Sequence, residues 1–143
     1  MHLVATPIRI SDLLAGDDEF KTGADVLFLG IVRGDSHTRK VLYLEYEAYE
    51  EMAEQILSEL VSLSYEKWPL EEVKIFHRLG RVWLGQIAVA VEVKSAHRGE
   101  AYEASRYLIE EIKHRVPIWK KEYFTDGTSE WSLCSHVDVS ESA

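Results

Sequence analysis

The sequence predicts an α+β fold in which two helices pack on a mostly antiparallel sheet. Two long stretches carry apolar residues at helical spacing, and six shorter stretches alternate between apolar and polar residues or are rich in β-branched residues. These stretches follow one another in the order β-β-α-β-β-α-β-β. Pairs of neighbouring strands separated by helices are typical of antiparallel sheets with helices on one face.

The two helical stretches are residues 50–67 and about 99–114. Each has an apolar stripe at helical spacing, which predicts one buried face. Since proline cannot continue a regular helix, Pro69 and Pro117 end them. The stripe of the first helix contains Met52, Ala53, Ile56, Leu57, Leu60 and Val61, and that of the second contains Ala101, Ala104, Leu108 and Ile112.

The predicted strands differ in how they should be buried. The first has a near-continuous apolar run at residues 26–29, which predicts burial on both faces. The second alternates, with Leu42, Leu44, Tyr46 and Ala48 on one face. The fourth is β-branched and should be central, and residues 81–86 before it should be a connection. The six predicted strands are residues 24–32, 41–49, 73–79, 87–93, 118–124 and 131–137.

The 143-residue length predicts one domain over residues 1–143, with a variable N-terminal segment at 1–22 and a frayed tail at 138–143. The net charge of −9 argues against nucleic-acid binding. No apolar stretch is long enough to span a membrane, and the single cysteine, Cys134, excludes an internal disulfide. We therefore expect a cytoplasmic protein. Cys134 has no base at a recognisable spacing, so we interpret it as a plain thiol.

One stretch opposes the acidic character of the chain. From Lys94 to Lys121 there are seven Lys or Arg and four Glu, a net charge of +3 in a chain of −9. His97 and Arg98 lie where a strand leads into the second helix, and the start of a helix offers free N–H groups and a positive dipole. Such a cluster is a candidate anion site, because concentrated positive charge attracts anions.

Each candidate also has a structural interpretation. Arg33 can be an exposed strand end, the lysines can be a solvated surface, and for Lys121 the two interpretations are balanced. At Lys113 the helix dipole favours a charged amine, whereas burial and neighbouring cations favour a neutral one. His77, on the apolar side of its strand, is interpreted as a hydrogen-bonded structural histidine. Neither a metal site nor a cofactor is predicted, because no third ligand accompanies His97 and Glu100.

Seven segments, in order, resemble the large, catalytic subunit of molybdopterin synthase. The resemblance covers roughly residues 23–131, and together these segments are specific although none is decisive alone. The segments are Gly30–Arg33, Leu44–Tyr49, Trp68–Pro69, His77–Gly80, Ser95–Arg98, Lys113 and Pro117–Glu122. The resemblance implies a fold of the α/β-hammerhead type.

The resemblance also implies a reaction and partners. The family converts cyclic pyranopterin monophosphate to molybdopterin by installing two sulfurs as a dithiolene. The sulfur comes from a thiocarboxylate on the C-terminal Gly-Gly of a small ubiquitin-like subunit, whose tail enters the large subunit. The family is a dimer flanked by two small subunits, so we expect a homodimer within a heterotetramer. The alternative is a non-enzymatic docking module for a ubiquitin-like tail.

Carried onto this chain, the resemblance assigns residue roles. Lys113 is the first catalytic candidate, as proton donor or acceptor or as a transient acyl acceptor, and Lys120 is the second. Arg33, His97 and Arg98 would anchor the phosphate and pterin. The substrate-binding positions are Ile31, Val32, Arg33, His97, Arg98, Lys113, Lys120, Lys121 and Glu122.

Two positions depart from the family pattern. The loop 34–40 lacks the second glycine expected there and carries Arg39 and Lys40 instead. Glu130 stands before Trp131, where relatives often carry a basic residue. The resemblance therefore does not assign a cross-subunit cation to that point.

Overall fold

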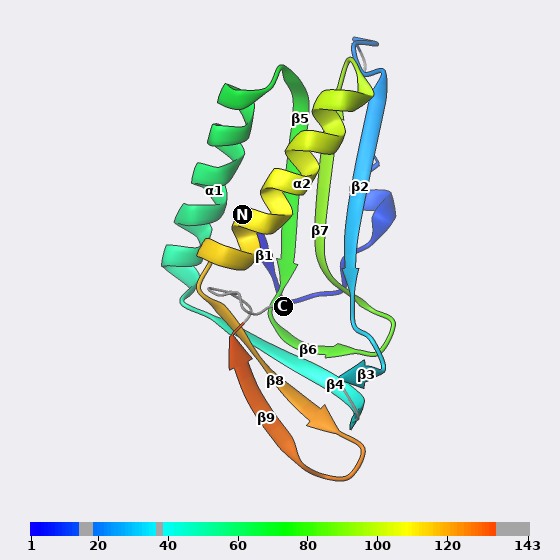
Figure 1. Cartoon of the computed structure of the whole chain (residues 1–143), viewed down its shortest axis with the longest axis vertical. Coiled ribbons are helices and arrows are strands. Elements are labelled where there is room, and N and C mark those ends of the chain that lie inside the picture. Colours follow the sequence, from blue (N-terminus) through cyan, green and yellow to red (C-terminus); the bar gives the residue numbers. More distant parts are fainter. Residues whose placement is uncertain (15–18, 37–38, 134–143) are drawn as a thin grey trace.

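The computed structural model describes residues 1–14, 19–36 and 39–133. It contains two α-helices, one short 3-10 helix (η1) and nine strands among these residues (Figure 1). The elements are β1 (Leu3–Val4), η1 (Ile10–Asp12), β2 (Ala24–Ile31), β3 (Asp35–Ser36), β4 (Arg39–Ala48), α1 (Glu50–Lys67), β5 (Leu70–Arg78), β6 (Gly80–Trp83), β7 (Ile87–Ser95), α2 (Arg98–Arg115), β8 (Ile118–Phe124) and β9 (Ser129–Leu133).

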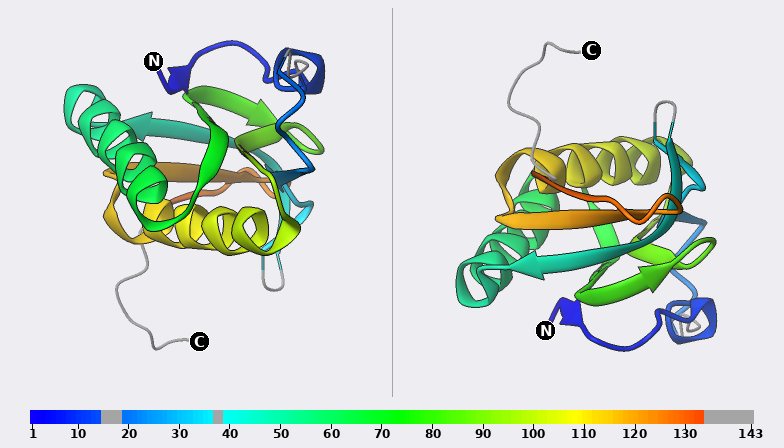
Figure 2. Two further views of the ribbon diagram at one scale, coloured as in Figure 1. Left: turned by 90° about the horizontal axis from the view of Figure 1, so that it is seen from above. Right: turned by 90° about the horizontal axis from the view of Figure 1, so that it is seen from below.

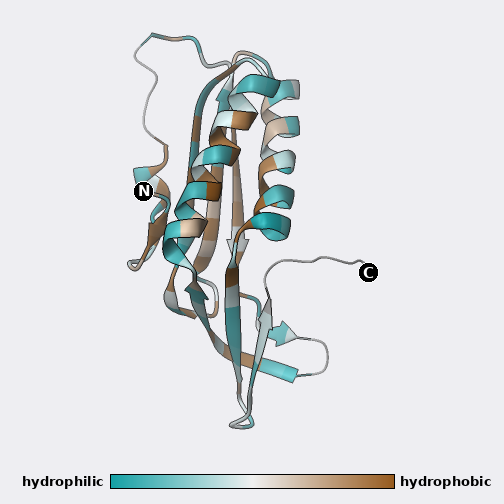
Figure 3. Cartoon of the chain, turned by 90° about the vertical axis from the view of Figure 1, so that its left-hand side faces the viewer, coloured by the Kyte–Doolittle hydropathy of each residue, from teal (hydrophilic) through white to brown (hydrophobic). Residues whose placement is uncertain are grey.

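The first sheet has the strand order β1-β5-β7-β2 and is antiparallel except for the β1–β5 pair. The predicted central strand, β7, lies between β5 and β2, and it is buried from Ala88 to Ser95. Helix α2 packs on one face of this sheet, while the N-terminal segment crosses the other (Figure 2). Figure 3 shows the hydrophilic residues on the outer sides of both helices. The core therefore lies between the helices and the first sheet.

The second sheet extends below the first and is wholly antiparallel. Strand β4 pairs with β6 on one side and with β8 on the other, β9 pairs with β8, and β3 pairs with the start of β4. The turn from β5 into β6 uses Gly80, whose φ of 84° is unfavourable for residues with a side chain. The two sheets thus meet near the ends of β2, β5 and α2.

The predicted fold class is confirmed, and both helices lie where the sequence places them. Three predicted details are wrong. The connection 81–86 contains part of a strand, β6, because β4 has a free edge for it to pair with. Met52 is 53% exposed, since only part of the α1 stripe fits against the sheet and α2. Leu42 is exposed and Val41 is buried, because an irregularity in the β4–β8 register exchanges their faces.

Strand β2 also differs from its prediction. The apolar run predicts burial on both faces, yet β2 is the edge strand of the first sheet and pairs with β7 alone among the described residues. Phe28 and Ile31 are 36% and 52% exposed, respectively. The predicted strand at 131–137 is confirmed as far as Leu133, and its remainder, with Cys134 and the 138–143 tail, lies outside the described residues.

Candidate functional site

A cavity of about 620 Å³ lies where the first sheet and the end of α2 meet the second sheet. The cavity is lined by both polar and apolar side chains. Its lining comes from segments spread over a hundred residues of sequence: Gly30, Ile31, Val32, Arg33, Asp35, Ser36, Arg39, Val41, Leu44, Tyr46, His77, Ala88, Val89, Lys113, Lys120, Glu122, Phe124, Glu130 and Ser132.

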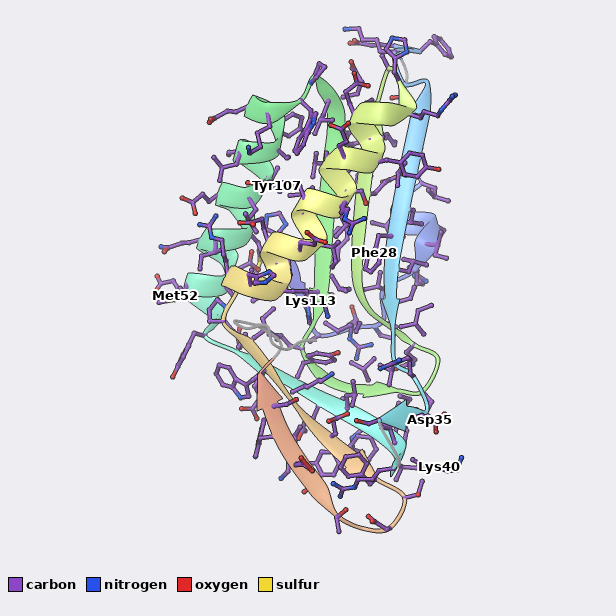
Figure 4. All side chains as sticks on the ribbon, viewed as in Figure 1. Phe28, Asp35, Lys40, Met52, Tyr107 and Lys113 are labelled. Carbon is purple, nitrogen blue, oxygen red and sulfur yellow. The ribbon has the colours of Figure 1, made fainter. Side chains whose placement is uncertain are left out.

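Four basic side chains line this cavity, one of them that of Arg39 at the start of β4, together with three carboxylates. Arg33 follows the end of β2, Lys113 lies in the last turn of α2, and Lys120 lies on β8. Figure 4 labels Lys113 at the end of α2 nearest the second sheet. A concave wall that carries several positive charges attracts anions and concentrates them. The cavity is thus suited to an anionic ligand.

The second sheet arranges its cavity-facing residues in two rows. Tyr46, Lys120 and Ser132 are direct partners across β4, β8 and β9. Leu44, Glu122 and Glu130 form the neighbouring row. Side chains opposite each other on antiparallel strands share one face, so Lys120 and Glu122 lie on the same face of the sheet as their cavity-lining partners.

His77, Tyr46 and Lys113 all line the cavity. His77 is only 5% exposed, and its ring meets Tyr46 edge-on with centroids 5.1 Å apart. The Nδ1 atom lies 2.8 Å from the carbonyl oxygen of Arg78. Because a carbonyl can only accept, Nδ1 carries the proton and the neutral ring keeps a lone pair on Nε2.

The pKa of His77 is lowered to about 4, mainly by burial and to a smaller extent by the nearby charge of Lys113, while the hydrogen bond to the Arg78 carbonyl opposes the shift. The imidazole is therefore neutral at physiological pH. His77 is thus the buried, hydrogen-bonded histidine that the sequence predicts, and it also lines the cavity.

The structure gathers six of the nine predicted substrate-binding positions around the cavity: Ile31, Val32, Arg33, Lys113, Lys120 and Glu122. The other three do not line it. Lys121 lies on the opposite face of the second sheet, with Nζ 5.2 Å from the ring centroid of Tyr123 and 5.4 Å from that of Trp131. His97 and Arg98 are exposed at the start of α2. The 15 residues from Arg98 to Lys113 span about 22 Å of helix.

The two departures from the family pattern meet in space. Arg39 Nη1 lies 2.6 Å from Glu130 Oε2, and Arg39 Nη2 donates to the hydroxyl of Thr128. The Arg39 guanidinium carbon also lies 3.7 Å from the ring centroid of Phe124. Arg39 and Glu130 both line the cavity. The acidic residue at 130 is therefore accompanied by a compensating cation from β4.

Comparison with known proteins decides the family. The family model described as MoaE protein matches residues 3–115. The chain belongs to the MoaE family. The molybdopterin synthase catalytic subunit of Staphylococcus aureus (strain COL) is 49% identical over 130 residues, which cover 91% of this chain and 87% of the relative.

Solved structures agree with this membership. The crystal structure of molybdopterin synthase from Staphylococcus aureus has a TM-score of 0.83 and 42% identity, covering 92% of this chain and 95% of the other. A protein–protein complex of subunits 1 and 2 of molybdopterin-converting factor from Helicobacter pylori contains a chain with a TM-score of 0.71 and 23% identity, covering 87% and 85%. That second likeness shows the shared fold.

Sequence reasoning did not place three cavity residues of this MoaE chain. Tyr46 and His77 lie on the apolar faces of their strands. Those faces line a cavity only because the first and second sheets meet there. Arg39 is separated from Glu130 by 91 residues, so no local pattern connects them. Over the described ranges, no three His, Cys, Asp or Glu residues are arranged to hold a metal ion, and neither α1 nor α2 is long and apolar enough to cross a membrane.

Proposed function

We propose that this chain is the catalytic subunit of a molybdopterin synthase. It converts cyclic pyranopterin monophosphate to molybdopterin, and the sulfur comes from the C-terminal thiocarboxylate of a small ubiquitin-like subunit. The observation that carries this proposal is the convergence of Arg33, Lys113 and Lys120 on one cavity in a MoaE-family chain. Both reactants are anions, so one cationic cavity suits the substrate phosphate and the thiocarboxylate alike.

Lys113 and Lys120 are the residues proposed to act on the reacting atoms. They approach the cavity from α2 and β8, so a reacting carbon between them has an amine on two sides. Lys113 gives or takes a proton as sulfur adds and the substrate ring opens, and Lys120 stabilises the negative charge that develops. Because the partner supplies the sulfur, this reaction requires no cysteine of the large subunit.

The partner is a small sulfur-carrier subunit with a C-terminal Gly-Gly, whose extended tail enters the cavity. The Helicobacter pylori complex of the two converting-factor subunits shares this fold and supports such a partner. A docking module that only binds the tail would need cations for the tail's C-terminal carboxylate alone. It would not need additional cations in the same cavity. The cationic wall therefore favours the enzyme over the docking module.

The positions of His97 and Arg98 support a homodimer that shares its sites. These residues lie at the Ala24 end of β2, since Ala24 pairs with Ser95, whereas Arg33 lies just past the other end. Among the described residues β2 is an edge strand with Phe28 and Ile31 exposed, and long apolar edges are normally covered. Antiparallel pairing of two β2 edges about a two-fold axis brings His97 and Arg98 of one copy near Arg33 of the other.

The proposal is tested with purified chain, thiocarboxylated carrier subunit and cyclic pyranopterin monophosphate. Mass spectrometry should detect the dithiolene product, and a carrier with an ordinary C-terminal carboxylate is the control that should give none. Carrier binding without product would overturn the enzymatic proposal and leave the docking module. Product formation requires both the substrate and the sulfur donor, so it separates this reaction from chemistry on another phosphorylated metabolite.

A further inference from the structure

The Arg39–Glu130 pair forms one end of the cavity, away from the catalytic lysines. Glu130 on β9 lies opposite Glu122, which is two residues from Lys120 along β8. Arg39 packs on Phe124, which is four residues from Lys120 along the same strand. At about 3.3 Å per residue the pair lies about 7–13 Å from Lys120. That separation is comparable to the length of three fused six-membered rings, which is the ring system of a pyranopterin.

The pair offers both donors and acceptors to a ligand in the cavity. A guanidinium has five N–H groups, and the contacts to Glu130 and Thr128 occupy two of them. Glu130 binds Arg39 through Oε2, while a carboxylate can accept at both oxygens. Phe124 and Thr128 hold the guanidinium in place, so its donors are fixed in direction.

We propose that Arg39 and Glu130 bind the 2-amino-4-oxo edge of the pterin ring. Arg39 donates to the 4-oxo group, and Glu130 accepts from N3–H and the 2-amino group. This inference rests on the proposed function, because it assigns the far end of the same substrate. The phosphate and the reacting carbons then lie toward Lys113 and Lys120.

Charge explains why the pair suits a neutral edge better than a second anion. Arg39 is already neutralised by Glu130 at 2.6 Å, so its attraction for a distant phosphate is largely cancelled. Hydrogen bonds to charged partners remain stronger than those between neutral groups. A donor and an acceptor side by side match an edge that carries one acceptor and two donors, and they mismatch an edge that carries two carbonyls.

The test compares two fluorescent probes, 6-hydroxymethylpterin and 6-hydroxymethyllumazine, which differ in having an amino or an oxo group at position 2. Titrations contain inorganic phosphate to occupy the cationic end. Wild type should bind the pterin about tenfold or more tightly than the lumazine, the scale of a lost hydrogen bond to a charged group. Glu130→Gln should abolish or reverse this preference, because the amide of glutamine can donate to a 2-oxo group.

Arg39→Gln should weaken both probes about tenfold, since both carry the 4-oxo group. Glu47→Gln, which removes an exposed carboxylate on the outer face of β4, is the control and should change neither affinity. Equal affinities of wild type for the two probes, or equal weakening of both by Glu130→Gln at an unchanged melting temperature, would overturn the inference and leave the pair as a link between two hairpins.

The product assay separates this inference from the proposed function. If wild type forms molybdopterin and Glu130→Gln keeps the wild-type probe preference, only the assignment of the pterin edge is wrong. If the preference changes as expected but wild type forms no product, the edge assignment stands and the proposed reaction is wrong.

Discussion

The two ends of helix α2 carry similar residues but have different surroundings. At its start, His97 and Arg98 are exposed and do not line the 620 Å³ cavity. At its end, Lys113 lines a cavity with Arg33, Lys120 and the buried His77. One end of α2 therefore contributes to a cavity, and the other end presents a histidine and an arginine at the surface. A second copy of the chain is the simplest way to unite them.

The comparison shows what a basic cluster in a sequence can mean. The stretch 94–121 looks like one positive patch when its charges are counted, yet its two halves lie about 22 Å apart along the helix. Charge density along the chain is thus a guide to basic residues near one another in sequence, whereas the length of the helix shows that its two ends cannot contact one ligand within a single chain.

The largest expected effect is at the cavity end. Lys113→Ala should lower kcat by about a hundredfold or more, the scale of a lost general acid or base, without lowering thermal stability. Lys67→Ala is the matched control. Lys67 is also a lysine in the last turn of a helix, α1, but its amine lies over the rings of Trp68 and Tyr107. Turnover of Lys113→Ala within a few-fold of wild type would transfer the catalytic role to Lys120 or to the carrier tail.

The start of α2 is tested by complementation between copies. Arg33→Ala and Arg98→Ala should each lower activity about tenfold to a hundredfold, as expected for a lost charged contact to the substrate. A heterodimer of the two variants, isolated with two different tags, has one site with both arginines and one site with neither. It should recover about half of wild-type activity if the dimer is two-fold symmetric.

Residues that act within one chain would give a different result. Each chain of the heterodimer would then lack one of its own arginines, and activity would stay at the level of the single variants. The same heterodimer carrying Arg98→Ala in both chains is the control, and its activity should not rise above that of the Arg98→Ala single variant.

The sequence predicted most of the fold because its patterns are local. Pro69 and Pro117 fix the ends of both helices, and the β-branched run of β7 predicts its central place. The edge position of β2 could not be predicted, because hydrophobic periodicity indicates that a strand is buried but not whether its own chain or another chain covers it. The exposure of Leu42 depends on an irregularity in the β4–β8 register, which no sequence pattern in β4 predicts.

The site was predictable only in part. Motif resemblance identified Arg33, Lys113 and Lys120, which are brought together by three separate elements. The Arg39–Glu130 pair depends on two hairpins meeting, and its members look like unrelated departures in the sequence. His77 was placed correctly on an apolar face, but a face next to a second sheet is also the base of a cavity.

The pH dependence of stability provides a smaller test of the cavity end. The pKa of His77 is lowered to about 4 from an ordinary 6.5, so the unfolded chain binds this proton first as the pH falls. The contribution of neutral, buried His77 to the free energy of unfolding is therefore fully present above about pH 6.5 and is lost toward pH 4. The loss amounts to about 2 kcal/mol between pH 7 and 5. His77→Gln should remove that part of the slope in urea unfolding, whereas His114→Gln, at an exposed position, should retain it. An unchanged slope in His77→Gln would mean that the ring is accessible to protons in the folded protein.

The smallest expected effect is at Lys121, a neighbour of the catalytic candidate Lys120 in sequence. Its amine lies against the rings of Tyr123 and Trp131 on the outer face of the second sheet, so its charge does not face the cavity. Lys121→Ala should change kcat less than about threefold and cost about 0.5–1 kcal/mol of stability, the value of an exposed cation–π contact. Lys120→Ala, one residue away and facing inward, should do the reverse by lowering kcat strongly at nearly unchanged stability. A large loss of kcat in Lys121→Ala would mean that the outer face of the second sheet also contacts the reacting groups. Because Lys120 and Lys121 lie on opposite faces of β8, a second chain would then have to place an active site against that outer face.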